Sequence, residues 1–92
     1  MIRSFADVDT ELVFNRRHNR LYAAFERVAL RKLRQIHRVS SVEELSEPPG
    51  NRLEKLKGDR EELWSLRIND QWRVCFEWRD GDAYEVQIVD YH

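Results

Sequence analysis

Apolar and polar residues alternate with a period of two over the last third of the chain. The alternation runs through "LWSLRIN" (63–69), "WRVCFEW" (72–78) and "YEVQIVDY" (84–91). The turn sequences Asn69-Asp70 and Asp80-Gly81-Asp82 separate these runs, and the latter is a strong hairpin signal. The pattern predicts three antiparallel strands that share one apolar face.

A helical period marks the first part of the chain instead. Apolar residues recur every three or four positions in one stretch, which predicts a helix over about 22–38. An earlier helix is expected over about 8–17, with Asp7 or Asp9 as its N-cap and arginines near its end, as the helix dipole favours.

The flanking segments complete the predicted fold. "IRSF" (2–5) suits a short edge strand, and residues 40–51 suit a short helical turn that ends at Pro48-Pro49-Gly50. The expected class is α+β, with two N-terminal helices packed on one face of a small, mostly antiparallel, twisted sheet.

Strand alternation also assigns side chains to the two faces of the sheet. If even-numbered residues face the helices, the opposite face carries Ser65, Arg67, Arg73, Cys75, Glu77, Glu85, Gln87 and Tyr91. This face is expected to be open and polar, with Arg67 and Arg73 on neighbouring strands. An ordinary solvated sheet face is the simpler interpretation, and a binding surface is the other.

Length and composition agree with a single domain. The 92 residues suffice for one modest core, and no apolar run approaches the roughly 20 residues that span a membrane. The opening "MIRSFADVDTE" lacks the apolar segment of a signal peptide, and the single cysteine, Cys75, cannot form an internal disulfide. We therefore expect a cytoplasmic protein without membrane contact, in which Cys75 is a small strand residue rather than a nucleophile.

Charge is unevenly distributed, although the net charge is only −1. Residues 15–38 contain one acid, Glu26, and eight basic residues: Arg16, Arg17, Arg20, Arg27, Arg31, Lys32, Arg34 and Arg38. This asymmetry suggests attraction to a polyanion or to an acidic partner. Four arginines follow helical spacing and are either solvated surface or a patch that faces ribosomal RNA: Arg27, Arg31, Arg34 and Arg38.

Neither a metal site nor a cofactor site is expected. His18, His37 and His92 are isolated, and no Cys/His pair has the spacing of metal ligands. The chain also lacks a glycine-rich phosphate loop. Residues 52–64 instead contribute Lys55, Lys57 and Arg60, which form either a charged hairpin loop or phosphate ligands beside Arg67 and Arg73.

These residues suggest cleavage of RNA without a metal ion, in which the 2′-hydroxyl attacks its own phosphodiester. The reaction needs a base, cations at phosphorus and an acid for the leaving oxygen. His92 suits either proton transfer near neutrality. Asp90 suits orientation of His92, and Tyr91 suits contact with the phosphate or stacking on a base.

The run "PPGNRLEKLKGDREELWSLRINDQWRVCFEW", followed by "DGDAY" and "VDYH", resembles the HigB toxins of the RelE superfamily over nearly the whole chain. The resemblance implies a RelE-like fold and a metal-independent ribonuclease that cuts mRNA on the translating ribosome. It also implies a HigA-like helix-turn-helix antitoxin, whose complex with the toxin represses their operon, so that operator DNA is contacted only through that complex. We expect a monomer when the toxin is free.

The resemblance also assigns roles to residues. Lys57 and Arg73 match the phosphate-binding cations of the family, and "DYH" (90–92) matches its catalytic C-terminus. Glu54 stands where some relatives have a histidine, so Glu54 is a further candidate for proton transfer. Two alternatives remain: a ParE-like toxin that poisons DNA gyrase, and an RNA-binding regulator without turnover.

Overall fold

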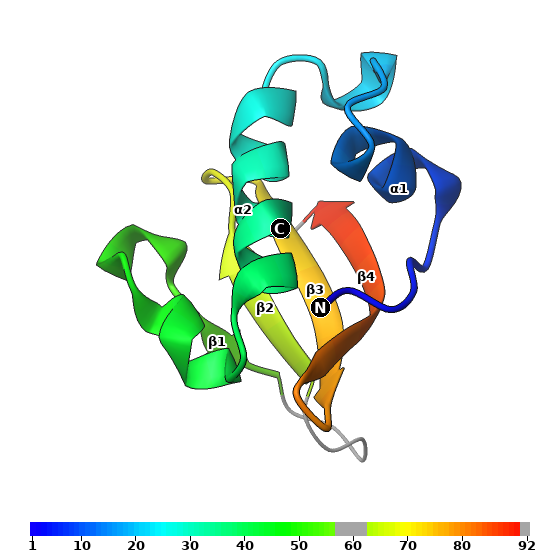
Figure 1. Ribbon diagram of the computed structural model, residues 1–92. Coiled ribbons are helices and arrows are strands. Elements are labelled where there is room, and N and C mark those ends of the chain that lie inside the picture. Colours follow the sequence, from blue (N-terminus) through cyan, green and yellow to red (C-terminus); the bar gives the residue numbers. More distant parts are fainter. Residues whose placement is uncertain (57–62, 91–92) are drawn as a thin grey trace.

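A four-stranded antiparallel sheet in the order β1-β2-β3-β4 forms the base of the computed structural model (Figure 1). The structure describes residues 1–56 and 63–90. The strands are β1 (Glu54–Lys55), β2 (Leu63–Arg67), β3 (Trp72–Arg79) and β4 (Asp82–Asp90). The α+β class and the meander are confirmed, and the two-residue β1 extends the sheet beyond the three predicted strands.

The first helix, α1 (Val8–Phe14), begins where the sequence predicts and ends earlier. Asp7 is the N-cap, since its Oδ1 accepts a hydrogen bond from the Thr10 backbone N–H at 2.7 Å. The helix does not reach residue 17 because Arg16 has a φ of 60°, which a right-handed helix cannot accommodate.

The second helix, α2 (Glu26–Arg38), ends as predicted and starts four residues later. Asn19 accepts the Leu21 N–H through Oδ1 at 2.8 Å and so starts a separate 3-10 turn, η1 (Arg20–Tyr22). Phe25, with φ −136° and ψ 15°, interrupts the backbone between the turn and the helix. Two further 3-10 turns follow α2, η2 (Val42–Ser46) and η3 (Pro49–Asn51).

Residues 2–5 lie along β4, although they form two isolated bridges and not a regular strand. Ile2 pairs with Ala83 and Phe5 with Val86, both in parallel orientation. Backbone hydrogen bonds such as Arg3 N–H to the Ala83 carbonyl, at 2.7 Å, satisfy the free edge of β4.

The core lies between α2 and the sheet (Figure 1). Ala29, Leu33 and Ile36 on one side of α2 are fully buried, as the helical stripe predicts. They share the core with sheet residues such as Val74 and Val86. Among the helices of residues 1–56 and 63–90, none is long and apolar enough to span a membrane.

Tyr84 does not face the helices, which corrects the assignment from alternation. A bulge interrupts the register between β3 and β4, because Cys75 pairs with Gln87 while Glu77 pairs with Tyr84. Glu85, at φ 51°, occupies the bulge and reverses the alternation beyond it. Ala83 takes the core position with 0% exposure, and Tyr84 stacks under Arg79 on the other face, 4.0 Å from the guanidinium carbon to the ring centroid.

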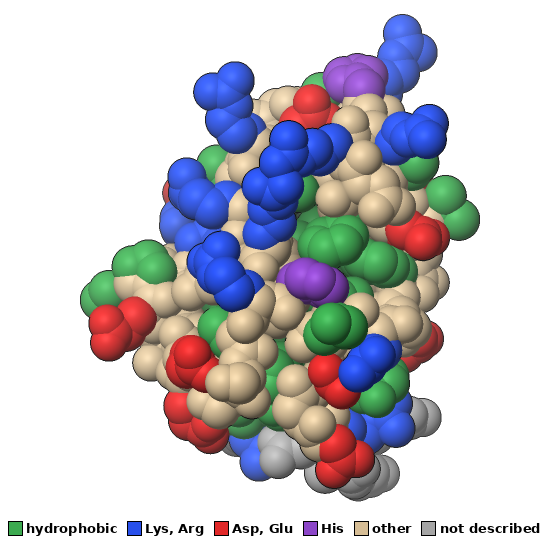
Figure 2. Space-filling model, in the orientation of Figure 1, with side chains coloured by type: hydrophobic (Ala, Val, Ile, Leu, Met, Phe, Trp, Pro, Cys, Tyr) green, Lys and Arg blue, Asp and Glu red, His purple; other side chains and the backbone are tan. Residues whose placement is uncertain are grey.

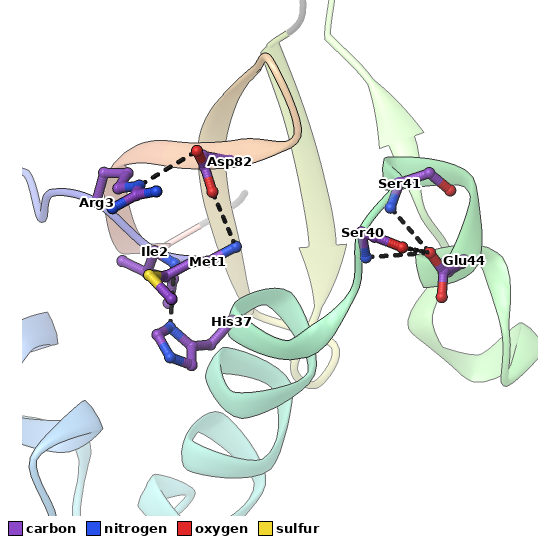
Figure 3. Close-up of polar contacts among 8 residues, drawn as sticks. All are labelled: Met1, Ile2, Arg3, His37, Ser40, Ser41, Glu44 and Asp82. Atoms are coloured by element: carbon purple, nitrogen blue, oxygen red, sulfur yellow. Dashed lines mark hydrogen bonds and ion pairs between the residues drawn. The ribbon is translucent and has the colours of Figure 1, made fainter.

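Asp82 connects the start of β4 to the N-terminal segment (Figure 3). Its carboxylate contacts the Met1 amino group and Arg3 Nε, each at 3.2 Å. Partial desolvation raises the pKa of Asp82, but these two cationic partners outweigh it and hold the pKa below its ordinary value.

Asp82→Asn is therefore expected to destabilise the protein at pH 7 and to have a smaller effect at pH 3. The folded carboxylate binds protons less readily than the unfolded one, so its contribution is present above its unfolded pKa of about 3.9 and is lost as the pH falls. Urea unfolding at both pH values measures the difference. Asp80→Asn in the same turn is the control, and a penalty for Asp82→Asn that does not change with pH would contradict the prediction.

Candidate functional site

Arg73 on β3 is buried, although alternation predicted that it would stand on an open face. Its exposure is 8%, because the side chain lies along the sheet toward β2 and β1. Nε donates to Ser65 Oγ at 2.9 Å, and Nη2 donates to the backbone carbonyls of Arg52, at 2.6 Å, and Ser65, at 3.4 Å. The guanidinium plane is therefore fixed by three hydrogen bonds.

The centre of this sheet face is correspondingly closed. Ser65 is fully buried beneath Arg73, and its register partner Cys75 is 7% exposed. Burial raises the pKa of the Cys75 thiol, and Arg73 offsets this only in part. The prediction of an open polar face is wrong here, while the interpretation of Cys75 as a small strand residue agrees with its burial.

Arg67 on β2 lies directly opposite Arg73 in the strand register. Like charges at such a position destabilise a sheet. Two carboxylates offset them, since Arg67 Nη2 forms an ion pair with Asp70, and Arg73 Nη2 lies 3.5 Å from Glu54 Oε1. Paired arginines balanced in this way cost the fold stability, which is typical of functional sites.

A hollow of about 290 Å³ opens beside these groups and is defined here as the arginine hollow. Its lining residues are Arg52, Glu54, Arg67, Asn69, Asp70 and Arg73. Three arginines and two carboxylates thus share one small polar space. Guanidinium groups bind phosphate oxygens in a bidentate manner, so the arginine hollow can hold an oxyanion next to a carboxylate.

The structure brings Glu54 and separates Lys55 from this group. Glu54 pairs with Ser65 across β1 and β2 and therefore shares the face of Arg73. Lys55 pairs with Trp64, which packs on the core side, and its Nζ lies 5.8 Å from the Trp64 ring centroid. Lys55 is thus not a ligand of the arginine hollow.

Asp90 lies at the end of β4, opposite Trp72 in the register. Cross-strand partners share a face, so Asp90 is on the helix side, where its Oδ2 accepts from Gln71 Nε2 at 3.0 Å. The preceding residue, Val89, pairs with Arg73, so the end of β4 runs beside the site. Four predicted site residues lie outside the described ranges: Lys57, Arg60, Tyr91 and His92.

The comparison with known families explains this set of residues. A model of the RelE-like toxin of the type II toxin-antitoxin system HigB matches residues 3–92. The chain belongs to this HigB family. The RelE-like fold and the family membership indicated by the sequence motifs are thereby confirmed, and a toxin of such a system implies an antitoxin partner.

Individual relatives of this HigB toxin have informative names. Toxin HigB-1 of Vibrio cholerae serotype O1 is 36% identical over 74 residues, which cover 80% of this chain and 78% of that protein. Endoribonuclease HigB of Proteus vulgaris is 46% identical over 41 residues, or 45% of either chain. An uncharacterized protein of Haemophilus influenzae is 28% identical over 71 residues.

A second feature of this HigB toxin is the basic side of α2 (Figure 2). Arg27, Arg31, Arg34 and Arg38 are all exposed and, with Leu30, line a shallow groove of about 290 Å³. Within residues 1–56 and 63–90, none of these four arginines forms an ion pair; Glu26, the nearby acid, contacts His18 at 3.5 Å. The four are defined here as the arginine stripe.

Sequence analysis missed two contributors to the HigB site. Ser65 and the Arg52 carbonyl position Arg73, but Ser65 was assigned only a surface place and Arg52 no role. Arg52 adopts a left-handed conformation with φ 44° and ψ 57°, which turns the backbone after Pro-Pro-Gly-Asn. The unusual turn sequence was the available signal, although it did not reveal which side chain the turned carbonyl would meet.

Proposed function

We propose that this HigB toxin is an endoribonuclease that cleaves translated mRNA on the ribosome and so inhibits translation and growth. The fixed guanidinium of Arg73, beside Arg67 and Glu54 in one hollow, carries the proposal. The similarity to a relative named Endoribonuclease HigB supports it.

The proposed reaction is an internal transesterification at phosphorus. The 2′-oxygen of one nucleotide attacks the adjacent phosphorus, the bond from phosphorus to the 5′-oxygen breaks, and the proton of the 2′-hydroxyl leaves as the 5′-oxygen gains one. Negative charge gathers on the non-bridging oxygens, where Arg73 and Arg67 would stabilise it. Each well-placed donor of this kind contributes roughly 10²–10³-fold. Lys57 and Arg60 would add charge from the segment that precedes β2.

Proton transfer is assigned to carboxylates and imidazole, so no metal ion is required. His92 would protonate the leaving 5′-oxygen, with Asp90 orienting it and Tyr91 stacking on a base. Glu54 would accept the 2′-hydroxyl proton, and its position 3.5 Å from Arg73 supports this role, since both groups would face the same phosphodiester. Chelation of divalent ions is expected to leave cleavage unchanged once the ribosomes are kept intact.

The partners proposed are the ribosome with its mRNA and a HigA-like antitoxin with a helix-turn-helix domain. Operator DNA would be contacted through the toxin–antitoxin complex. The arginine stripe supports a ribosomal contact, because four exposed arginines along α2 present a row of charge to RNA phosphates.

Arg31→Ser combined with Arg34→Ser is expected to weaken binding to ribosomes and to lower its salt dependence. Loss of two phosphate contacts should reduce the slope of log affinity against log salt by about one to two units. Sedimentation with ribosomes over a range of KCl concentrations measures the slope. Arg79→Ser, at an exposed arginine of β3, is the control, and a double variant with the wild-type slope would contradict a stripe–RNA contact.

The function itself is tested by brief induction in cells and mapping of mRNA 5′ ends. New ends inside translated regions, abolished when translation initiation is blocked, are expected. Cuts that persist without ribosomes would contradict the ribosome-dependent mechanism. Growth arrest with intact mRNA and damaged chromosomal DNA would favour a gyrase poison instead.

A further inference from the structure

Asn51, the last residue of η3, is a fully buried polar side chain that no assigned role explains. Its Oδ1 accepts a hydrogen bond from Lys32 Nζ. Its Nδ2 contacts Gln35 Oε1 at 2.9 Å and the backbone carbonyls of Leu45 and Glu47 at 3.1 and 3.2 Å. One amide thus joins α2, η2 and the turn before β1.

These contacts are costly to break because each involves a group removed from water. Lys32 is only 8% exposed, and burial lowers its pKa, with further lowering by the charges of Arg31 and Arg67. The Asn51 amide is therefore an essential acceptor for a buried ammonium group. The influence of Arg67 on Lys32 also indicates that this cluster adjoins the arginine hollow.

The residue after Asn51 connects the cluster to Arg73. The Arg52 N–H donates to the Pro49 carbonyl at 3.1 Å, and Arg52 has the left-handed conformation described above. Its carbonyl then accepts from Arg73 Nη2 at 2.6 Å. The position of this carbonyl depends on the turn, and the turn is held to α2 by Asn51.

We propose that Asn51 is a positioning residue for Arg73, which acts by fixing the Arg52 carbonyl that orients the Arg73 guanidinium. The inference deepens the proposed function and rests on it for the consequence on cleavage. Its structural part, the orientation of Arg73, does not depend on that function.

The first test follows the Arg73 Nε–H by NMR, since this group donates to the buried Ser65 hydroxyl. Arg73→Lys identifies the resonance by its disappearance. In Asn51→Ala, exchange of the Arg73 Nε–H with water is expected to accelerate at least tenfold. Val13→Ala, a core variant on α1, is the control for general destabilisation and should leave this exchange rate within twofold. Unchanged exchange in folded Asn51→Ala would overturn the proposal, whether or not the protein cleaves RNA.

The second test is a double-mutant cycle on ribosome-dependent cleavage. Asn51→Ala is expected to lower kcat/KM at least tenfold in the wild-type background and by less than twofold in Arg73→Ala, because the orienting contact is already absent there. Equal losses in both backgrounds would overturn the proposal. No cleavage by the wild-type protein would refute the proposed function and leave the NMR result as the test of positioning.

Asn51→Asp serves if Asn51→Ala does not fold. The carboxylate keeps the acceptor for Lys32 and removes the donors to the Leu45 and Glu47 carbonyls. The same acceleration of Arg73 exchange is expected, and its absence in this folded variant would count equally against the proposal.

Discussion

Arg73→Ala is expected to lower RNA cleavage by roughly 10²–10³-fold, the effect of removing one well-placed donor to the developing charge. The residue lines the arginine hollow and is held in one orientation by the Ser65 hydroxyl and the Arg52 carbonyl. A lysine at this position keeps the charge but loses the planar fork, so Arg73→Lys should retain most of the defect. Cleavage of a defined mRNA on purified ribosomes measures both variants.

A loss of stability accompanies this change and must be separated from it. Removal of Arg73 leaves the buried Ser65 hydroxyl and the Arg52 carbonyl without this donor, which costs about 1–3 kcal/mol by the usual penalty for unsatisfied buried groups. Urea unfolding defines a temperature at which the variants are folded, and the rates are compared there.

Arg34→Ala is the matched control because it removes an exposed arginine from the arginine stripe. A smaller loss of activity is expected than for Arg73→Ala, since Arg34 would contribute binding and not charge stabilisation at phosphorus. Equal losses from the two variants would indicate a broad electrostatic surface and would contradict the assignment of phosphate binding to Arg73.

His92→Gln is expected to abolish growth inhibition, with a loss of roughly 10²–10⁴-fold in cleavage, while the protein stays folded and bound to its antitoxin. Glutamine preserves hydrogen bonding but cannot exchange a proton near neutral pH, which isolates proton transfer as the cause. Deletion of Tyr91 and His92 should have at least the same effect. Cleavage on ribosomes and co-purification with the antitoxin measure the two properties.

The control for this variant is His18→Gln, at an exposed histidine near the start of the basic segment. It should remain toxic, because its only described ionic contact is with Glu26 on the surface. A fully toxic His92→Gln would show that the assignment of catalysis to the C-terminal residues is wrong.

Most of the fold was predictable because local periodicity reports burial. The stripe on α2 and the alternation in β2 and β3 correspond to the buried residues of the core. Helix boundaries were less predictable, since the early end of α1 and the late start of α2 depend on single backbone conformations at Arg16 and Phe25. Such conformations leave no periodic signal.

The candidate site was predicted in its residue types more than in its geometry. Arg67, Arg73 and Glu54 were selected correctly as neighbours, because β2 and β3 pair in the expected register and β1 adds to their edge. Lys55 was assigned to the same group but lies on the other face, next to Trp64. The two-residue strand β1 was not predicted, so the face of each of its side chains could not be assigned.

The sequence by itself determined the kinds of secondary structure, the α+β class and the family, because these depend on patterns within short segments and on motifs along the chain. Only the tertiary structure decided that Arg73 lies flat and buried, that Tyr84 changes face at a bulge, and that Asn51 joins three elements. Each of these depends on contacts between distant residues, such as the 21 positions that separate Arg73 from Arg52. Alternation assumes regular strands with side chains perpendicular to the sheet, so a long arginine side chain or one extra residue is enough to overrule it.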